Sequence, residues 1–514
     1  MKTTPWILLI AVWAHAISAS AVRLNEHGAR QLSELPPAGV HPRVFFTAGD
    51  LPDIRVRLES EGFGEAFQPI LQQVTSGVKK QWTPFAELDL TRPTEEQVVA
   101  YVKSGEGRNI EWGMAALHAV LYDDDALRDL MGRVTENYAR LLLASRKLAL
   151  EKQTAGAEGS LPKNLGFWLN DRYDVGVSWT VGAAGYAVCY DVLYNHMTHE
   201  QRDIVREAIA LSTRGRRPYG AGMPIGFAAS NHYGYHGDLA VLLCAIEGEP
   251  GYDKETFDVI TQILRDYWDV GFTARGACHE DGYGPNLGLR GGGRGYMALA
   301  RRGLNIFATK KFGHFIDWLA LEHEPFPEGV LVGGASGAHY TSMYPTSTVL
   351  LRYMYPDRPT ANFCYRHLLG DRFERGFRWQ GRLDFMLFGG DWKGPERREA
   401  MLESAGLDLT TYFPERGKWM ARSDWSEDAV CLTLDARPDA WMIGHDKVDR
   451  GHFTVSALGR MWAFIGDFHH WNTSMENSMV HIDGKAQAWK APSARFVWQQ
   501  DAGTTAAACV DLKY

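Results

Sequence analysis

The chain has 514 residues, of which 62 are acidic and 54 are basic, so its formal net charge is −8. Hydrophobic residues make up 45% of the chain and charged residues 23%, a composition that excludes wholesale disorder. The negative balance argues against a general nucleic-acid binder, because contacts with phosphates need a basic face.

The N-terminus has the pattern of a secretory signal peptide over residues 1–22. Lys2 precedes an apolar run from Trp6 to Trp13, and small residues around Ala19 offer cleavage sites. The apolar run is too short to span a bilayer, and no later segment has membrane length. We therefore expect a secreted or periplasmic protein that has no membrane partner.

From about residue 50 to 375 the apolar residues recur at helical spacing, with breaks rich in Gly, Pro, Asn and Asp. The clearest segments are 112–122, 126–143, 178–194, 200–212, 237–248, 255–272 and 295–307. Many antiparallel helix pairs in succession predict a solenoid, a closed toroid or a large bundle. Because no fixed-length repeat is present, the usual solenoid families are disfavoured.

The six cysteines are widely scattered and include no CxxC pair, so they indicate neither a disulfide framework nor a zinc finger. Cys189 and Cys244 lie within apolar helical runs. We expect these two residues to be buried as small hydrophobic side chains.

After about residue 380 the sequence changes to short segments rich in β-branched and aromatic residues, separated by turn signals. These segments are 418–424, 429–437, 452–459, 460–467, 478–484 and 494–501. They predict an antiparallel sheet or sandwich. The expected organisation is a signal peptide (1–22), a helical domain (23–380) and a β domain (381–514). Because the strand pattern continues to Tyr514, we expect the β domain to be incomplete in this chain.

A first polar cluster extends from Ser230 to His236 and opens an apolar helix. Asn231 and His232 stand at the start of this helix, where backbone N–H groups favour an anion. Alternatively, Asn231 only caps the helix and His232 fills a turn. His232 and His236 have the spacing of metal ligands, but the glutamate of the HExxH motif is missing.

A second cluster, His279–Gly284, is followed by a glycine-rich stretch that carries Arg290 and Arg294. The glycines do not follow a strand in the GxGxxG pattern, so no nucleotide site is predicted. The pattern favours a mobile substrate loop whose two arginines bind a carboxylate or sulfate, although a solvated basic loop is the alternative. His339 and Tyr340, in another glycine-rich stretch, are further candidates for substrate binding, as are His279 and Glu280 within the cluster.

A third cluster extends from Gly444 to Phe453 and leads into a predicted strand. It contains two histidines, His445 and His452, together with several charged residues. Taken alone, such a cluster also fits a surface turn that is held by ion pairs.

Together and in this order, the clusters resemble those of the heparinase II/III-like polysaccharide lyases and their uronyl-epimerase relatives. The residues that carry the resemblance are His41–Thr47, Trp179, Ala187, Tyr190–Leu193, Asn231–His232, Asp281–Gly284, Gly417–Trp425, His445, Asp449, His452–Phe453, Ile482–Gly484 and Gln487. The resemblance covers most of the chain. It implies an α+β multidomain protein, with an N-terminal (α/α) toroid, a C-terminal antiparallel β-sandwich and the site in the cleft between them. The helical and strand patterns independently give the same order, with helices first and strands after them.

The resemblance also implies a structural metal site in the β domain, and the sequence departs from it. The family uses two histidines and an aspartate as ligands, but Lys447 and Glu476 stand at the histidine positions, while Asp467 matches the aspartate. A lysine ammonium between two carboxylates can replace the charge of the cation. We therefore expect no bound metal and no cofactor.

The activity that the resemblance implies is removal of the C5 proton of a uronic acid, with expulsion of the 4-O-linked sugar. Asn231, with His232, would hydrogen-bond the carboxylate and stabilise the enolate-like charge. If the C5 proton and the leaving group lie on the same face of the sugar, Tyr283 would act as both base and acid. If they lie on opposite faces, His232 would be the base and Tyr283 the acid. His445 would contact the carboxylate or tune Tyr283. Tyr296 is a second candidate tyrosine, with a role in the core or in a helix cap as its alternative.

Three other functions fit parts of the pattern. A uronyl C5-epimerase shares the proton abstraction but returns a proton without expelling the leaving group. A glycoside hydrolase on the same toroid needs two opposed carboxylates, whereas the clusters are rich in His, Tyr and Asn. A non-catalytic polysaccharide-binding protein would tolerate Tyr283→Phe. In each case we expect an anionic polysaccharide and no nucleic acid as the partner; the polymer and the endo or exo mode stay open.

Overall fold

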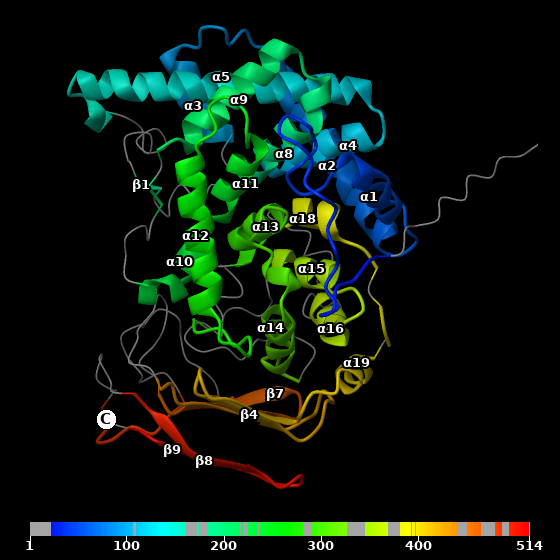
Figure 1. Cartoon of the computed structure of the whole chain (residues 1–514), viewed down its shortest axis with the longest axis vertical. Helices are drawn as coiled ribbons and strands as arrows, with labels where there is room; N and C mark the ends of the chain where they lie inside the picture. The colour runs from blue at the N-terminus through cyan, green and yellow to red at the C-terminus, as the bar shows by residue number, and fades with distance from the viewer. Residues whose placement is uncertain are drawn as a thin grey trace, which may run out of the picture.

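The structure is a computed structural model with a helical part followed by antiparallel strands (Figure 1). The residues that it describes are 22–105, 109–160, 172–173, 183–215, 217–218, 225–234, 236–280, 289–325, 345–367, 381–391, 393–395, 397–438, 450–463, 478–485 and 493–512. Most of the predicted signal peptide, residues 1–21, therefore lies outside the described residues. No helix among those described is long and apolar enough to cross a membrane.

Helices occupy most of the chain up to Ser404, as the apolar spacing predicted. They are α1 (Leu51–Leu58), α2 (Phe63–Ala86), α3 (Glu95–Gly105), α4 (Asn109–Leu121), α5 (Asp125–Thr154), α8 (Ala183–Leu193), α9 (His199–Thr213), α10 (Asn231–Gly234), α11 (Gly237–Ala245), α12 (Lys254–Gly271), α13 (Leu289–Ala300), α14 (Lys310–Leu321), α15 (Pro345–Met354), α16 (Pro359–His367), α18 (Arg382–Phe388) and α19 (Arg398–Ser404). Each of the seven predicted helical segments is represented. The helices also extend beyond the predicted domain boundary at residue 380.

Six of the described helices form a closed ring. In this inner ring α4 packs against α8, α8 against α11, α11 against α13, α13 against α15 and α15 against α18, which returns to α4. Inner helices are enclosed on all sides, and every residue of α11 is buried accordingly. The amphipathic helices α2, α5 and α12 pack on the outside of this ring. The arrangement is a toroid of inner and outer helices, which is the fold class that the sequence predicted.

The inner helices run in parallel. The starts of α4 and α8 touch, because a Cβ atom on Gly113 would lie 2.9 Å from Gly185. A Cβ atom on Gly295 in α13 would lie 2.5 Å from Gly237 at the start of α11, so α13 approaches that helix closely as well. The first residue of α18, Arg382, pairs with Glu111 near the start of α4.

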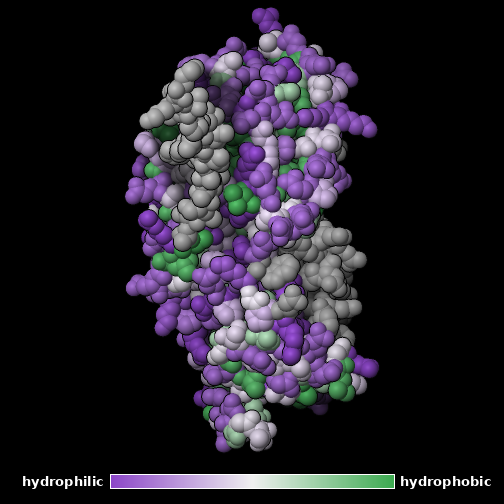
Figure 2. All heavy atoms as spheres, turned by 90° about the vertical axis from the view of Figure 1, so that its right-hand side faces the viewer, coloured by the Kyte–Doolittle hydropathy of each residue, from purple (hydrophilic) through white to green (hydrophobic). Residues whose placement is uncertain are grey.

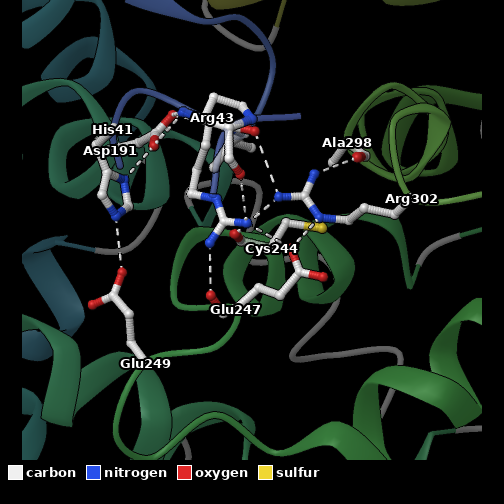
Figure 3. Close-up of polar contacts among 10 residues, drawn as sticks. His41, Arg43, Asp191, Cys244, Glu247, Glu249, Ala298 and Arg302 are labelled. Carbon is white, nitrogen blue, oxygen red and sulfur yellow. Dashed lines mark hydrogen bonds and ion pairs between the residues drawn. The ribbon is translucent and has the colours of Figure 1, made fainter. Parts of the chain in front are cut away.

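The N-terminal strap, residues 22–50, contacts the ends of these inner helices, and Figure 3 shows the polar contacts that its His41 and Arg43 make there. The imidazole of His41 lies between two carboxylates, with Nδ1 2.7 Å from Asp191 of α8 and Nε2 2.8 Å from Glu249 beyond α11. Burial lowers the pKa of His41, but the hydrogen bonds to both carboxylates outweigh burial and raise it. Arg43 donates to the main-chain carbonyl of Glu247 at 2.6 Å.

Other arginines contact the carbonyls at the same end of the ring. Nε of Arg30 donates to the Tyr353 carbonyl near the end of α15, and the guanidinium of Arg57 in α1 donates to Leu387 and Gly389 at the end of α18. Cationic donors are favourable there because carbonyls at helix C-termini carry partial negative charge. The N-terminal strap and α1 thus close the C-terminal end of the ring.

The chain after α19 forms a five-stranded antiparallel sheet and a separate hairpin. The sheet has the order β3 (Thr410–Phe413), β4 (Lys418–Arg422), β5 (Cys431–Asp435), β6 (His452–Ala457) and β7 (Arg460–Ala463), and the hairpin pairs β8 (Arg495–Asp501) with β9 (Ala506–Asp511). Buried residues alternate along β5 and β6, as in a sheet that packs on one face. Figure 1 shows the hairpin on the side of the sheet away from the helices.

Five of the six predicted strand segments are confirmed by β4, β5, β6, β7 and β8. The prediction is wrong for the described part of 478–484, which contributes only an isolated bridge between Ile482 and Lys485. Strand β3 was not predicted. The six cysteines are unpaired, and Cys189 and Cys244 are buried as predicted.

Candidate functional site

Buried polar contacts join the helical part to the sheet. Lys418 Nζ in β4 lies 2.7 Å from Glu322 Oε2 just after α14, and both side chains are buried. Arg422 Nη2 donates to the carbonyl of Leu321 at 2.8 Å. We use the term junction for residues 271–280 and 321–324 of the helical part together with Arg416, β4, β5 and β6.

The junction and the N-terminal strap lie at opposite ends of the ring. The 18 residues of α12 start five residues after Glu249 and end at Gly271, which separates the two ends by about 27 Å. Inner helix α13 follows the segment that leads on from α12, so it starts on the junction side. Because the inner helices are parallel, their N-termini point toward the junction.

At the centre of the junction, Arg416 and Asp435 form a buried ion pair. Nη2 lies 2.8 Å from Oδ2, and Nη1 donates to Oδ1 at 3.2 Å. Asp435 of β5 stands directly opposite His452 of β6 in the strand register, and His452 is only 3% exposed. His452, from the third predicted cluster, is therefore next to this ion pair.

Arg416 also connects the sheet to the second predicted cluster. Its Nε donates to the carbonyl of Cys278 at 3.2 Å. The next residue, His279, donates its backbone N–H to Gly271 at the end of α12, and Glu280 is buried. These contacts hold the described start of the second cluster against the sheet.

The first predicted cluster reaches the same region through α12. A Cβ atom on Gly271 would lie 3.5 Å from Ala229, which directly precedes Ser230 and the helix start. The backbone N–H of His232 donates to Ser230 Oγ at 3.4 Å, and α10 packs against both α12 and α13. The described members of all three clusters therefore gather where the ring meets the sheet.

Glu324 is a buried acid in the junction that sequence reasoning missed. Its Oε2 accepts a hydrogen bond from Ser456 Oγ, while its Oε1 accepts none from the residues that the structure describes. Burial raises the pKa of Glu324 to about 8, and the nearby Arg422 offsets this only in part. Arg398 donates to the Glu324 carbonyl at 2.5 Å, and burial lowers the pKa of Arg398 to about 10. The junction is thus a layer of charges from which water is largely excluded.

Several predicted site residues lie outside the described residues. These are Tyr283, His339, Tyr340 and His445 among the substrate and catalytic candidates, and Lys447, Asp467 and Glu476 in the predicted replacement of a metal site. Asn231 begins α10, and Arg290 lies in the first turn of α13. Among the described residues, no three His, Cys, Asp or Glu side chains are grouped so as to hold a metal ion.

The predicted mobile loop around Arg290 and Arg294 is wrong from Leu289 onward, because this stretch is helix α13. Arg294 is 1% exposed, and its Nε and Nη2 each donate to a different carboxylate oxygen of Asp384 at 2.8 Å. Its Nη1 lies 3.6 Å from Asp238. Arg294 therefore ties three inner helices together and presents no exposed guanidinium to a substrate.

Tyr296 is a core residue, which was the alternative that the sequence left open. Its side chain is fully buried, and its hydroxyl donates to the Leu264 carbonyl at 2.6 Å. Burial raises the pKa of Tyr296 well above the usual value of a tyrosine. The hydroxyl is thus neither accessible to a substrate nor suited to act as a base.

The residues that sequence reasoning missed at this site are mainly Arg416, Asp435, Glu322 and Glu324. A signal existed for Asp435, since a carboxylate inside the apolar segment 429–437 needs a partner when it is buried. The Glu-His-Glu run at 322–324, after an apolar helix, was a second such signal.

No protein-family model matches the chain, and no curated protein matches it. Among solved structures, the chain is similar to a heparan sulfate lyase from Pedobacter heparinus, with a TM-score of 0.45 and 10% identity over 89% of this chain and 74% of that one. It is also similar to a heparinase III gene product (TM-score 0.43, 10% identity, 91% of this chain and 75% of that one). A further heparinase III structure has a TM-score of 0.43 and 11% identity over 89% of this chain and 75% of that one.

Proposed function

We propose that the protein is a polysaccharide lyase that cleaves a uronic-acid-containing polymer by β-elimination at the junction. The observation that carries this proposal is the meeting of the three clusters at one place. His232, His279 with Glu280, and His452 come from distant parts of the chain, yet their segments converge between ring and sheet. The ordered resemblance to heparinase II/III-like lyases gives this convergence its chemical interpretation.

The electrostatics of the ring support an anionic substrate. Each helix N-terminus carries about half an elementary positive charge, and the parallel inner helices direct these ends toward the junction. A carboxylate bound there is attracted locally even though the whole chain has a net charge of −8. This attraction offsets the unfavourable long-range field between an acidic protein and an acidic polymer.

In the proposed reaction, the substrate carboxylate is bound by the amide of Asn231 together with His232. Hydrogen bonds to this carboxylate stabilise the negative charge that develops when the C5 proton leaves. The C5–H electrons form the C4–C5 double bond, and the C4–O bond breaks toward the departing sugar. The products are one chain with an unsaturated end and one chain with a free hydroxyl group at its new end.

Tyr283 is the proposed acid, and His232 or Tyr283 itself is the base. Tyr283 follows the buried Glu280 by three positions in the sequence. A positioned side chain that transfers a proton in this way contributes roughly 10²–10⁴-fold to the rate. We assign His445 to the substrate carboxylate or to tuning of Tyr283, and His279, Glu280, Arg290, His339 and Tyr340 to the surroundings of the substrate.

The decisive experiment is a screen of purified protein against alginate, glucuronan, ulvan and glycosaminoglycans. A lyase produces ultraviolet absorbance from the new double bond as the polymer shortens. New reducing ends without absorbance would contradict elimination and point to a hydrolase. Exchange of the C5 proton with solvent deuterium without shortening would point to a C5-epimerase, and binding without any change would point to a carbohydrate-binding protein.

We also propose that the β domain binds no structural metal. The ammonium of Lys447, set between the carboxylates of Asp467 and Glu476, would supply the positive charge at this position. Metal analysis of the purified protein is expected to find no stoichiometric zinc. Stoichiometric zinc that is lost on Asp467→Ala would overturn this proposal.

Secretion is proposed from the pattern of residues 1–22. Expression of the full chain in a bacterial host, followed by N-terminal sequencing of the exported product, is expected to find a new N-terminus near residue 22. Retention of Met1 on the exported protein, or absence of export, would contradict a cleaved signal peptide.

A further inference from the structure

A cavity of about 510 Å³ lies at the strap end of the ring, away from the junction. It is bounded by the N-terminal strap, α1, the end of α13, α15 and α18. Four arginines and three carboxylates are among the residues that line it: Arg23, Arg30, Arg57, Arg301, Glu34, Asp50 and Asp53. The volume is within the range of sites that bind small molecules.

The guanidinium of Arg57 is satisfied by main-chain carbonyls instead of a carboxylate. It donates to Leu387 at 2.6 Å and to Gly389 at 2.9 Å. Carbonyl groups solvate a cation but do not neutralise it. Burial accordingly lowers the pKa of Arg57, because the charged guanidinium is less favourable away from water.

Arg301 is in the same situation. It donates to the Ser33 carbonyl at 3.0 Å, and the nearest carboxylate oxygen, on Asp50, is 3.9 Å away. That carboxylate is itself bound by Ser33 Oγ and by the backbone N–H of Thr47, each at 2.7 Å. Within the described residues, Nη1 of Arg301 is buried and makes no hydrogen bond.

Arg30 completes the cationic part of the wall. Its guanidinium carbon lies 4.2 Å from the centre of the Tyr353 ring, and its Nε donates to the Tyr353 carbonyl at 2.9 Å. The ring of Tyr353 also faces Arg57 at 5.6 Å. Tyr353 thus contacts both guanidinium groups and keeps these two cations on the same part of the cavity wall.

The carboxylates do not cancel these charges. Glu34 and Asp53 are exposed, whereas Arg57 and Arg301 are held more deeply, so the positive charge lies inside and the negative charge near solvent. Figure 2 views the molecule from the side of α1, and its described surface there is mostly hydrophilic with hydrophobic side chains in small groups. Because Arg23, Glu34 and Asp53 on the cavity wall are exposed, the cavity is accessible to a polar ligand.

We propose that this cavity binds a small ligand through a carboxylate or sulfate group held by Arg30, Arg57 and Arg301. Guanidinium groups bind such oxyanions with paired, charge-assisted hydrogen bonds. This site is separate from the junction and does not depend on the lyase activity. Its ligand is either a free inorganic oxyanion or an acidic sugar, which share this chemistry.

Isothermal titration of the full chain with sodium sulfate, glucuronate and neutral glucose tests the proposal. Binding of sulfate or of glucuronate, but not of glucose, is the expected result, and the anion that binds tells which source fits. Arg30→Gln is expected to weaken binding about tenfold, because a charge-assisted hydrogen bond is lost. Arg55→Gln is the matched control, since Arg55 lies on α1 but pairs with Glu59 outside the cavity wall.

Asp53→Asn provides a test that does not rely on a loss. Removal of an exposed negative charge from the cavity is expected to tighten anion binding about two- to threefold, an effect that added salt weakens. A structural role of these residues would not produce this gain. The proposal is overturned if neither anion binds the unmodified protein, if Arg30→Gln and Arg55→Gln weaken binding equally, or if Asp53→Asn does not tighten it.

Discussion

The two ends of the helical ring consist of the same inner helices but are closed in different ways. At the strap end, His41 and Arg43 pair closely with acidic residues and carbonyls at the helix C-termini. At the junction, the sheet packs over the helix N-termini through a layer of buried charges that includes Glu324, whose pKa is raised to about 8. The strap end closes the ring and holds the arginine-lined cavity beside that closure, whereas the junction combines buried polar groups with the positive helix ends that the proposed anionic substrate needs.

This contrast gives a structural role to residues 41–47, the first motif of the resemblance to the lyase family. Residues 41–47 belong to the closure of the ring and lie about 27 Å from the proposed reaction, the length of α12. The motifs at 231–232 and 452–453 belong to the junction. Substitutions at the two ends should therefore separate stability from turnover.

The largest expected effect is on turnover at the junction. Tyr283→Phe should lower kcat about 10²–10⁴-fold with little change in binding, because the hydroxyl that transfers the proton is lost. Tyr296→Phe is the matched control: it removes the hydrogen bond to Leu264 and should lower stability while kcat stays the same. Rates from ultraviolet absorbance would show the difference, and equal losses of kcat in both variants would contradict the role of Tyr283.

The next largest effect is on stability at the strap end. His41→Ala leaves Asp191 and Glu249 without their shared donor and should lower the free energy of unfolding by about 3–5 kcal/mol. His199→Ala, which removes an exposed histidine paired with Asp203, should change it by less than about 0.5 kcal/mol. Denaturant unfolding measures both values. If the folded fraction of His41→Ala lost activity, the claim that the strap end affects stability and not turnover would be contradicted.

The pH dependence of the junction comes from Glu324. Because its folded pKa of about 8 is above the usual glutamate value of 4.5, its contribution to stability is fully present below pH 4.5 and is lost as the pH rises through 8. Each unit of raised pKa corresponds to about 1.4 kcal/mol, so the slope should be measurable by thermal unfolding. Glu324→Gln should flatten this slope, while the exposed Glu61→Gln should leave it unchanged. A wild-type slope in Glu324→Gln would exclude this residue as the cause.

The smallest effect should come from a helix cap. Thr309 Oγ1 accepts the Phe312 N–H at the start of α14, the helix that leads to Glu322 and Glu324. Thr309→Ala should lower the free energy of unfolding by about 1 kcal/mol, and Thr309→Ser should restore most of it. A change in the pH slope caused by Thr309→Ala would mean that the cap and the junction are coupled.

Local pattern was sufficient for most elements. Apolar spacing predicted α4, α5, α9, α11 and α12, and turn signals with β-branched residues predicted β4 to β8. Strand β3 (Thr410–Phe413) was missed because three of its four residues are half-buried and the strand depends on pairing with β4. The glycines of α13 were misjudged because Gly295 closely approaches Gly237 at a helix start 58 residues earlier, which no local pattern records.

The site was predictable as separate clusters but not as a network. His232, His279, Glu280 and His452 were found because polar residues stood next to apolar segments. Arg416 lies in the turn between β3 and β4, so its ion pair with Asp435 of β5 forms only once these strands have paired. Its hydrogen bond to the Cys278 carbonyl joins residues that are 138 positions apart. Arg294 was assigned to a substrate because its partner Asp384, 90 positions away, was invisible in the sequence.

Closure of the ring by its first segment also constrains how the chain folds. Arg30 and Arg57 bond to residues 323 to 332 positions later in the sequence, so the ring cannot close until α18 has been synthesised. Contacts of such large sequence separation are slow to form, because their loop-closure entropy is lost before they stabilise anything. The incomplete ring would expose apolar inner helices, a form that is prone to aggregation. Synthesis of α18 is thus required before the described ring can close.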